Sequence, residues 1–241
     1  MDKILKTKFH LKPTTHEGCL YQGQYKAEKI LFLRQVDDFA VAAEKEITAI
    51  NLIKEIDSHM TIDIKDLGLL TRYNGVDITQ SKYYVKISNK TYIDKLLNEH
   101  GWLLNDDKTS HQPITITNET TFHQRVENAI PPTNEKDSRQ FHLKMGLNYR
   151  QAIGELIFLM ITCRPDISYP LIKLSQYSNK PAEEHYQCVK QLFEYVKVTK
   201  TDGIYVWRKK PRHDLPDLPL PTTTKQIHPQ NVTIHLSYMG Q

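Results

Sequence analysis

The sequence has 241 residues, 39% of them hydrophobic and 25% charged, which is the composition of a folded protein and excludes a fibrous or wholly disordered chain. The formal net charge of +4 permits a polyanionic partner but equally fits ordinary surface charge. Three widely spaced cysteines, no signal peptide and no membrane-spanning apolar run predict an intracellular, non-secreted protein without disulfides or a membrane anchor.

The first predicted elements are a β-hairpin and a helix. Residues 30–33 and 39–42 form two apolar runs with the polar pair Asp37-Asp38 between them, which predicts a hairpin carrying both aspartates at its tip. Apolar residues then recur at helical spacing over residues 44–60, and this periodicity predicts an amphipathic helix.

A second hairpin and a short helix are predicted next. Residues 73–79 and 83–88 alternate apolar with polar side chains around Gln80-Ser81, as a half-buried strand pair does. The apolar stripe that follows predicts a short helix that ends just before Gly101, with Ser88 or Asn89 as its N-terminal cap.

Residues 105–147 lose this periodicity and predict a long polar linker. Helical patterns return at residue 148 and continue to about residue 200, although Pro170 is expected to kink or shorten the second of three helices. Residues 203–207 predict a strand, and after a proline-rich stretch residues 232–236 predict the start of another.

Two adjacent carboxylates at a strand turn are a candidate metal site. Mg²⁺ prefers carboxylate oxygens, and phosphoryl transfer to a hydroxyl uses divalent ions that stabilise both the attacking and the leaving oxygen. The alternative is an ordinary turn, since aspartate also hydrogen-bonds the backbone of tight turns. Asp106-Asp107 is such a pair without flanking apolar strands, and we interpret it as a solvated loop.

Val36-Asp37-Asp38 after an apolar strand resembles the Asp-Asp box of reverse transcriptases. Other segments, in matching order along the chain, resemble those of copia-type retrotransposon reverse transcriptases: Gly18-Cys19-Leu20-Tyr21, Lys65-Asp66-Leu67-Gly68, Tyr73-Asn74-Gly75-Val76-Asp77-Ile78, Tyr92-Ile93-Asp94-Lys95-Leu96-Leu97, Tyr149-Arg150-Gln151-Ala152-Ile153-Gly154-Glu155-Leu156, Thr162-Cys163-Arg164-Pro165-Asp166-Ile167 and Leu174-Ser175-Gln176-Tyr177. Their order and spacing make the resemblance specific.

The resemblance implies an α+β fold. It places a partial reverse-transcriptase palm at residues 1–104, a polar linker at 105–147, a helical thumb- or connection-like segment at 148–207, and at 208–241 a proline-rich tail holding the truncated start of a ribonuclease H-like region.

The resemblance also implies site residues. Asp37 and Asp38 become the catalytic, metal-binding aspartates, with Mg²⁺ (or Mn²⁺) as cofactor. Tyr73, Asn74 and Gly75 fall at the hairpin that grips the primer, with an ordinary strand glycine as the alternative for Gly75. The candidates for phosphate contact are Arg164, Lys209 and Lys210, although Arg164 can instead pair with Asp166.

The implied parent activity is RNA-directed DNA polymerisation on a template–primer duplex of RNA or DNA, with deoxynucleoside triphosphates, in a cytoplasmic particle or the nucleus. A further metal-binding aspartate is expected on a palm strand upstream, so we expect this chain to be inactive alone. The alternatives are a non-catalytic nucleic-acid-binding module, a degenerate remnant without a biochemical role, and a structural α+β protein in which the aspartates only form a turn.

Overall fold

The computed structural model describes residues 1–101, 119–208 and 233–239, and the remaining residues lie outside the described part. The chain divides into two units. We call residues 1–73, 78–86 and 205–241 the sheet unit, and residues 74–77 and 87–204 the helical unit. Antiparallel strands and helices occur together, which is compatible with the predicted α+β class.

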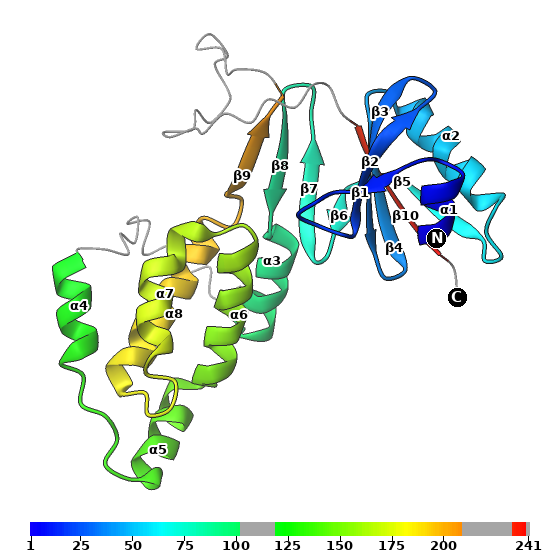
Figure 1. Ribbon diagram of the computed structural model, residues 1–241. Coiled ribbons are helices and arrows are strands. Elements are labelled where there is room, and N and C mark those ends of the chain that lie inside the picture. Colours follow the sequence, from blue (N-terminus) through cyan, green and yellow to red (C-terminus); the bar gives the residue numbers. More distant parts are fainter. Residues whose placement is uncertain (102–118, 209–232, 240–241) are drawn as a thin grey trace. The chain divides into compact units, whose positions relative to one another are not determined.

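The sheet unit is built on a six-stranded antiparallel sheet in the order β1-β2-β3-β4-β10-β5 (Figure 1). Its elements are α1 (Asp2–Thr7), β1 (Lys12–Pro13), β2 (Leu20–Tyr25), β3 (Glu28–Gln35), β4 (Asp38–Ala43), α2 (Glu46–Asp57), β5 (Ile64–Leu69) and β10 (Thr233–Met239).

The helix predicted over residues 44–60 is confirmed as α2, and it supplies one side of the core of the sheet unit. Leu52, Ile53 and Ile56 are buried on the face turned to the sheet, whereas Ile47, which has the same helical spacing as Ile53 and Ile56, is 58% exposed. The sheet supplies the other side, where the rings of Phe32 on β3 and Phe39 on β4 stack with their centroids 5.2 Å apart. The predicted hairpin therefore pairs β3 with β4, and burial of its aromatic residues fixes which face of the sheet is turned inward.

Strand β10 lies between β4 and β5 and pairs antiparallel with both (Figure 1). The sequence predicted a strand at residues 232–236 but assigned it to the start of a separate ribonuclease H-like region. In the structure this segment is instead an inner strand of the first sheet. The reason is that β4, α2 and β5 form a crossover that leaves room for one strand between two parallel neighbours.

A second sheet contains four strands in the order β6-β7-β8-β9. Its strands are β6 (Arg72–Tyr73), β7 (Val76–Gln80), β8 (Tyr84–Ser88) and β9 (Gly203–Trp207), and several contribute residues to both units. The predicted hairpin of residues 73–79 and 83–88 corresponds to β7 and β8, but its first strand begins at Val76 and not at Tyr73. The predicted strand at residues 203–207 is confirmed as β9, which lies beside β8.

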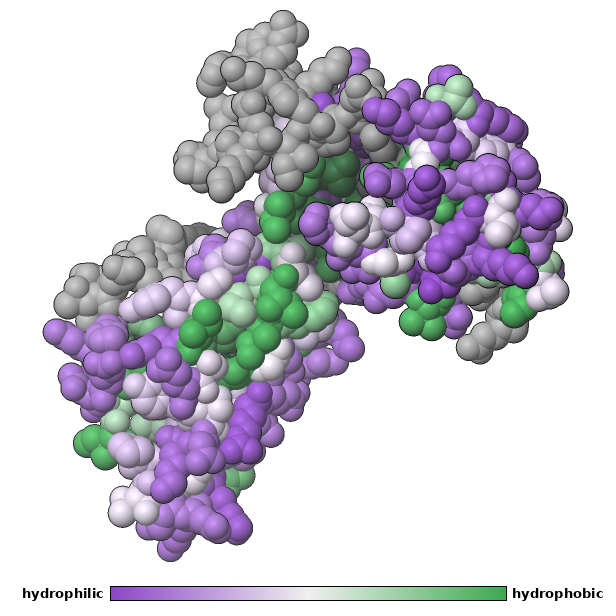
Figure 2. Space-filling model, viewed as in Figure 1, coloured by the Kyte–Doolittle hydropathy of each residue, from purple (hydrophilic) through white to green (hydrophobic). Residues whose placement is uncertain are grey.

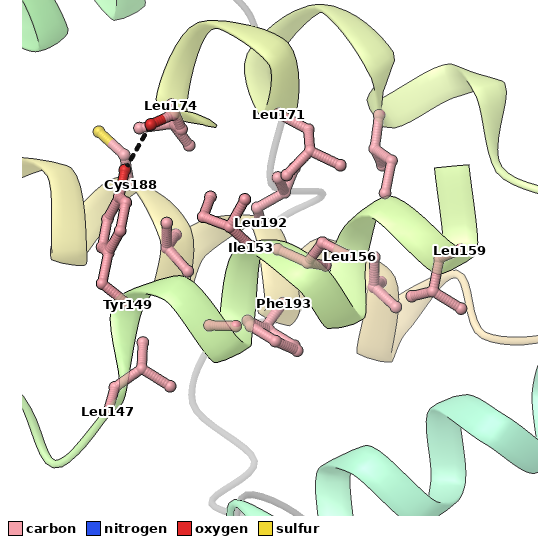
Figure 3. Packing of buried hydrophobic residues seen from close by; sticks show 14 of the residues in the cluster. Leu147, Tyr149, Ile153, Leu156, Leu159, Leu171, Leu174, Cys188, Leu192 and Phe193 are labelled. Atoms are coloured by element: carbon pink, nitrogen blue, oxygen red, sulfur yellow. Dashed lines mark hydrogen bonds between the residues drawn. The ribbon is translucent and has the colours of Figure 1, made fainter. Parts of the chain in front are cut away.

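The helical unit packs its helices around one apolar core (Figure 3). Its elements are α3 (Lys90–Glu99), α4 (Glu119–Glu127), α5 (Glu135–Met145), α6 (Tyr149–Thr162), the 3₁₀ turn η1 (Pro165–Ile167), α7 (Ser168–Ser175) and α8 (Glu183–Val198). Tyr149 lies in this core and donates a hydrogen bond of 2.8 Å to the carbonyl oxygen of Leu174 (Figure 3). Burial raises the pKa of the Tyr149 phenol, so it stays a neutral donor.

Two features of the predicted domain organisation differ in the structure. Residues 105–147 were expected to form a linker, but α4 and α5 lie within this range, and Phe122 and Val126 of α4 are buried in the helical core. Helix α3 was expected to belong to the palm, but its buried residues Ile93 and Leu97 pack into the same core. Both differences arise because packing partners, rather than local periodicity, decide where a short amphipathic segment goes.

Helix α7 shows how the chain accommodates Pro170. The helix begins at Ser168, after the 3₁₀ turn, so the proline lies in its first turn, where no intrahelical hydrogen bond is lost.

Each unit has its own core of buried apolar residues, and polar side chains cover most of the surface visible in Figure 2. No helix of the described residues is long and apolar enough to cross a membrane.

Gly203 allows β9 to approach β8 closely. A methyl group at this position would lie 2.3 Å from the carbonyl oxygen of Ile87. We expect Gly203→Ala to lower the free energy of unfolding by about 1–3 kcal/mol, because the strands would have to separate. Gly154→Ala in α6 is the matched control: its methyl group meets nothing within 4 Å, so we expect a gain of about 0.5–1 kcal/mol. Urea unfolding measures both, and equal effects would contradict the close approach.

His185 joins α4 to the start of α8 from a buried position. Its Nδ1 accepts the backbone N–H of Ala182 at 3.0 Å, so the proton lies on Nε2, which donates to the carbonyl oxygen of Val126 at 2.9 Å. The ring of Tyr177 packs against the imidazole, with the centroids 4.1 Å apart. Burial lowers the pKa of His185, and the Val126 carbonyl and nearby Glu184 only partly oppose this.

The lowered pKa predicts a pH-dependent stability. The native state binds fewer protons at His185 than the unfolded chain, so the stabilisation is complete above a pH of about 6.5 and is lost as the pH falls towards the folded pKa. When the pH falls from 7.5 to 5, we expect the free energy of unfolding to decrease more for the parent chain than for the His185→Gln variant. The difference between the two slopes is up to about 1.4 kcal/mol per pH unit. Chemical denaturation at each pH measures this difference, and parallel curves would contradict the buried neutral imidazole.

Candidate metal and primer-grip site

Asp37 and Asp38 lie at the tip of the β3–β4 hairpin, as the sequence predicted. Gln35 pairs with Asp38, so Val36 and Asp37 form a two-residue turn. Val36 has a φ of 53° and a relative exposure of 81%, and such a conformation is rare for a β-branched residue. Phe39, immediately after the pair, is fully buried. The two exposed carboxylates therefore stand on a turn that is anchored to the core by the next residue.

The described residues do not bring enough metal-binding side chains together for a two-metal site. Among residues 1–101, 119–208 and 233–239, no group of three or more histidine, cysteine, aspartate or glutamate side chains could hold a metal ion. Strand β4 lies between β3 and β10, and on the β10 side Tyr238 pairs with Asp38. The sequence of β10, Thr-Ile-His-Leu-Ser-Tyr-Met, includes no acid. The neighbouring strand thus contributes no third carboxylate.

The primer-grip candidates Asn74 and Gly75 form a tight turn between β6 and β7. Both have positive φ angles, 50° and 77°, which is the pattern of the two-residue turn that favours Asn-Gly. A methyl group on Gly75 would lie 3.3 Å from the Phe158 ring. The sequence had placed these two residues within a strand, and that assignment was wrong. Turn geometry alone accounts for both residue types.

Tyr73, the third primer-grip candidate, is electrostatically coupled to the aspartate turn. Burial raises the pKa of the Tyr73 phenol, and the charges of Asp38 and Cys19 raise it further. The phenol oxygen is buried and has no hydrogen-bond partner among the described residues. The structure therefore brings Tyr73 and Asp38 into one neighbourhood of the sheet unit.

Arg164 is buried in the helical unit, with a relative exposure of 1%. Its guanidinium donates to both carboxylate oxygens of Asp166, at 2.7 Å for the closest contact, and also to the backbone oxygen and hydroxyl of Thr199. Burial acts to lower the pKa of Arg164, but Asp166 outweighs it and the pKa is raised. Of the two roles considered for Arg164, the structure shows the pairing with Asp166 and leaves the side chain unavailable to a phosphate.

The remaining phosphate candidates, Lys209 and Lys210, lie outside the described residues.

The sequence shows how charged residues are distributed between the two units. The sheet unit has 18 lysines and arginines against 13 aspartates and glutamates, whereas the helical unit has 14 against 15. The net positive charge of the chain therefore belongs to the sheet unit and not to the helical unit.

The three cysteines are free thiols, Cys19 exposed and Cys163 and Cys188 buried. Burial raises the pKa of Cys188 to about 11 and also raises that of Cys163. A thiol with a raised pKa is a poor nucleophile at neutral pH because little of it is ionised. The buried cysteines are therefore packing residues.

Comparison with known proteins relates the chain to retrotransposon Pol polyproteins. It is 24% identical over 206 residues to the retrovirus-related Pol polyprotein from transposon TNT 1-94 of Nicotiana tabacum, an alignment that covers 83% of this chain and 14% of that protein. It is 43% identical over 177 residues to the Pol polyprotein from transposon RE1 of Arabidopsis thaliana, covering 73% and 11%. A putative transposon Ty5-1 protein of Saccharomyces cerevisiae is 28% identical over 191 residues, covering 78% and 52%.

These similarities support a retrotransposon Pol origin for the chain. The chain spans only 14% and 52% of the lengths of two of these relatives, so their whole activities are not transferred by the likeness. No family model matches the sequence, and no solved structure matches it.

The pairing of Arg164 predicts a structural effect. We expect Arg164→Ala to lower the free energy of unfolding by about 2–3 kcal/mol, because it removes a buried side chain together with its hydrogen bonds to Asp166 and Thr199. Arg164→Lys is expected to recover only part of this, since lysine cannot form the two-pronged contact. Arg139→Ala, at an exposed pair 3.8 Å from Glu135, is the control and should leave stability nearly unchanged. A stable Arg164→Ala variant with weakened duplex binding would instead indicate phosphate contact.

Proposed function

We propose that the chain corresponds to the reverse-transcriptase part of a retrotransposon Pol polyprotein and that it binds a template–primer duplex without extending it. The family assignment is supported by the similarity to Pol polyproteins together with the Asp-Asp turn on an antiparallel hairpin. A product of this kind would act inside the cell, in a cytoplasmic particle or the nucleus.

The proposed lack of catalysis is supported by one observation: the strand paired with β4, next to the aspartate turn, is β10. Nucleotidyl transfer with two metal ions needs more carboxylate ligands than Asp37 and Asp38 supply. The adjacent strand β10 contains no acidic residue, and its pairing with β4 leaves no room for a different strand at that edge. Mg²⁺ or Mn²⁺ is therefore expected to bind the exposed pair weakly, if the ion binds the chain at all.

Charge favours the sheet unit as the surface that binds nucleic acid. Many basic residues of the helical unit are already engaged by acids, and these pairs are Lys90–Asp94, Lys200–Asp94, Arg125–Glu184, Lys144–Glu183 and Lys173–Glu127. Exposed lysines of the sheet unit, such as Lys12 and Lys29, add to its positive excess. Such a surface attracts phosphates without reading sequence.

The first test is primer extension on an RNA template with Mg²⁺ or Mn²⁺. We expect no product from the chain or from its Asp37→Asn/Asp38→Asn variant, because no further carboxylate of the described residues joins the pair. An active reverse transcriptase run in parallel shows that the assay works. Extension by the chain that disappears in the double variant would show that the chain is catalytic.

Gel-shift titrations at several salt concentrations test the binding. Neutralising two sheet-unit lysines, Lys12→Gln and Lys29→Gln, should weaken binding and reduce the slope of log affinity against log salt by up to about 2. The matched control neutralises the exposed helical-unit residues Lys136 and Lys180 and should leave the slope unchanged. Absence of any salt-sensitive shift by the parent chain would favour a degenerate remnant without a biochemical role.

A further inference from the structure

One face of the β8–β9 strand pair carries three aromatic rings, all from residues of the sheet unit. Tyr205 and Trp207 are two residues apart on β9, so they lie on the same face of this strand. Their rings are nearly parallel, with 20° between the planes and 6.1 Å between the centroids. Tyr84 of β8 meets both rings edge-on, at centroid distances of 5.1 Å and 5.5 Å. We call Tyr84, Tyr205 and Trp207 the aromatic cluster.

A lysine ammonium lies on this cluster. Lys86 is two residues from Tyr84 and therefore on the same face of β8, and its Nζ lies 5.3 Å from the centroid of the Tyr205 ring. The ammonium is a point charge on a flexible four-carbon stem. A flat ligand can therefore take its place on the Tyr205 ring, while the ammonium moves aside and pairs with an anion of the same ligand.

Trp207 adds a hydrogen-bond donor that is not used. The side chain is only 7% exposed, and its indole Nε1 has no hydrogen-bond partner among the described residues. A buried indole N–H normally has a partner, because leaving such a donor unpaired is costly. A ligand that places an acceptor beside this N–H would remove the cost.

These groups together describe the chemistry of an unpaired nucleotide. Its base offers a flat face to Tyr205 and acceptor atoms to the Trp207 N–H, and its phosphate offers a negative charge to Lys86. The bases of a duplex are stacked on one another, so only unpaired bases expose their faces to a protein ring. A proline-rich peptide can also dock on aromatic side chains, but it brings no anion for Lys86.

We propose that the aromatic cluster and Lys86 bind unpaired bases of a single-stranded nucleic acid, with the Tyr205 ring as the stacking surface. This inference rests on the proposed function, because it assigns the unpaired part of a bound template–primer to this face. Stacking is tolerant of sequence, since every base has a flat face. The site adds affinity for single strands to the charge-based attraction of phosphates by the sheet unit.

The fluorescence of Trp207 tests the proposal on an intact aromatic cluster. The chain contains two tryptophans, so Trp102→Phe leaves Trp207 as the only one. We expect oligo(dT) and oligo(U) to quench this fluorescence saturably, and a blunt-ended duplex of equal length to quench it much less. A proline-rich peptide should leave it unchanged. Quenching by the peptide but not by the oligonucleotides would mean that the face binds peptide, and the proposal would be wrong.

Substitutions then test the individual residues with the same oligonucleotides, labelled for anisotropy. We expect Tyr205→Leu to weaken single-strand binding by about 5- to 100-fold, whereas Tyr205→Phe keeps the ring and should bind like the parent chain. Lys86→Gln should reduce the slope of log affinity against log salt by about 0.7, as expected for one phosphate contact on a single strand. Tyr169→Leu is the matched control, since this tyrosine of the helical unit is 46% exposed, and it should change neither quantity.

The duplex gel shift separates this inference from the proposed function. If a Tyr205→Leu variant with normal thermal unfolding binds single strands as well as the parent chain does, the aromatic cluster serves only packing and the inference fails, even where duplex binding persists. If Tyr205→Leu does not fold, the quenching of Trp207 decides, and its absence at protein concentrations that shift the duplex overturns the inference. Absence of all nucleic-acid binding by the parent chain would overturn both proposals.

Discussion

The pairing of β10 with β4 and β5 is the interaction on which the sheet unit depends. Without it, the two inner strands would each present a row of backbone groups lacking partners, beside a core that already holds Phe39 and Ile56. Unsatisfied edges of this kind are costly when buried and prone to wrong pairing when exposed. One segment at the end of the sequence therefore completes the sheet that carries the aspartate turn.

The pairing of β4 with β10 also determines which side chains lie on the strand next to the aspartate turn. A carboxylate pair at a hairpin tip is suited to hold a metal ion only when neighbouring strands aim further oxygen ligands at the same point. Here the adjacent strand β10 contains no acid, and among the described residues no group of three acidic, histidine or cysteine side chains could hold a metal ion beside the turn. In the helical unit, Arg164 likewise lies at a segment matching the family pattern but is fully engaged by Asp166 and Thr199.

Predictions from sequence patterns were correct for elements that local interactions determine and wrong for features that depend on contacts between distant residues. The spacing of apolar residues located α2 because each turn of a helix repeats the same contact with one core. On α6 the apolar run extends to Ile161, yet this residue is 69% exposed, because the partners of the helix cover a narrower stripe than the apolar run. The residue types Asn74-Gly75 favour a two-residue turn before β7, whereas the alternation of apolar and polar residues had placed both in a strand.

By itself, the sequence determined the two hairpins, the helices α2, α3 and α6 to α8, the position of the aspartates at a hairpin tip and the resemblance to retrotransposon Pol proteins, but it did not predict α4 or α5. These features follow from short-range periodicity, turn chemistry and ordered motifs. Only the tertiary structure decided that β10 belongs to the first sheet, that α3 and α4 join the helical core, and that Arg164 is buried. Such outcomes depend on contacts between residues far apart in the chain, and local spacing carries no information about which of several apolar surfaces a segment will meet.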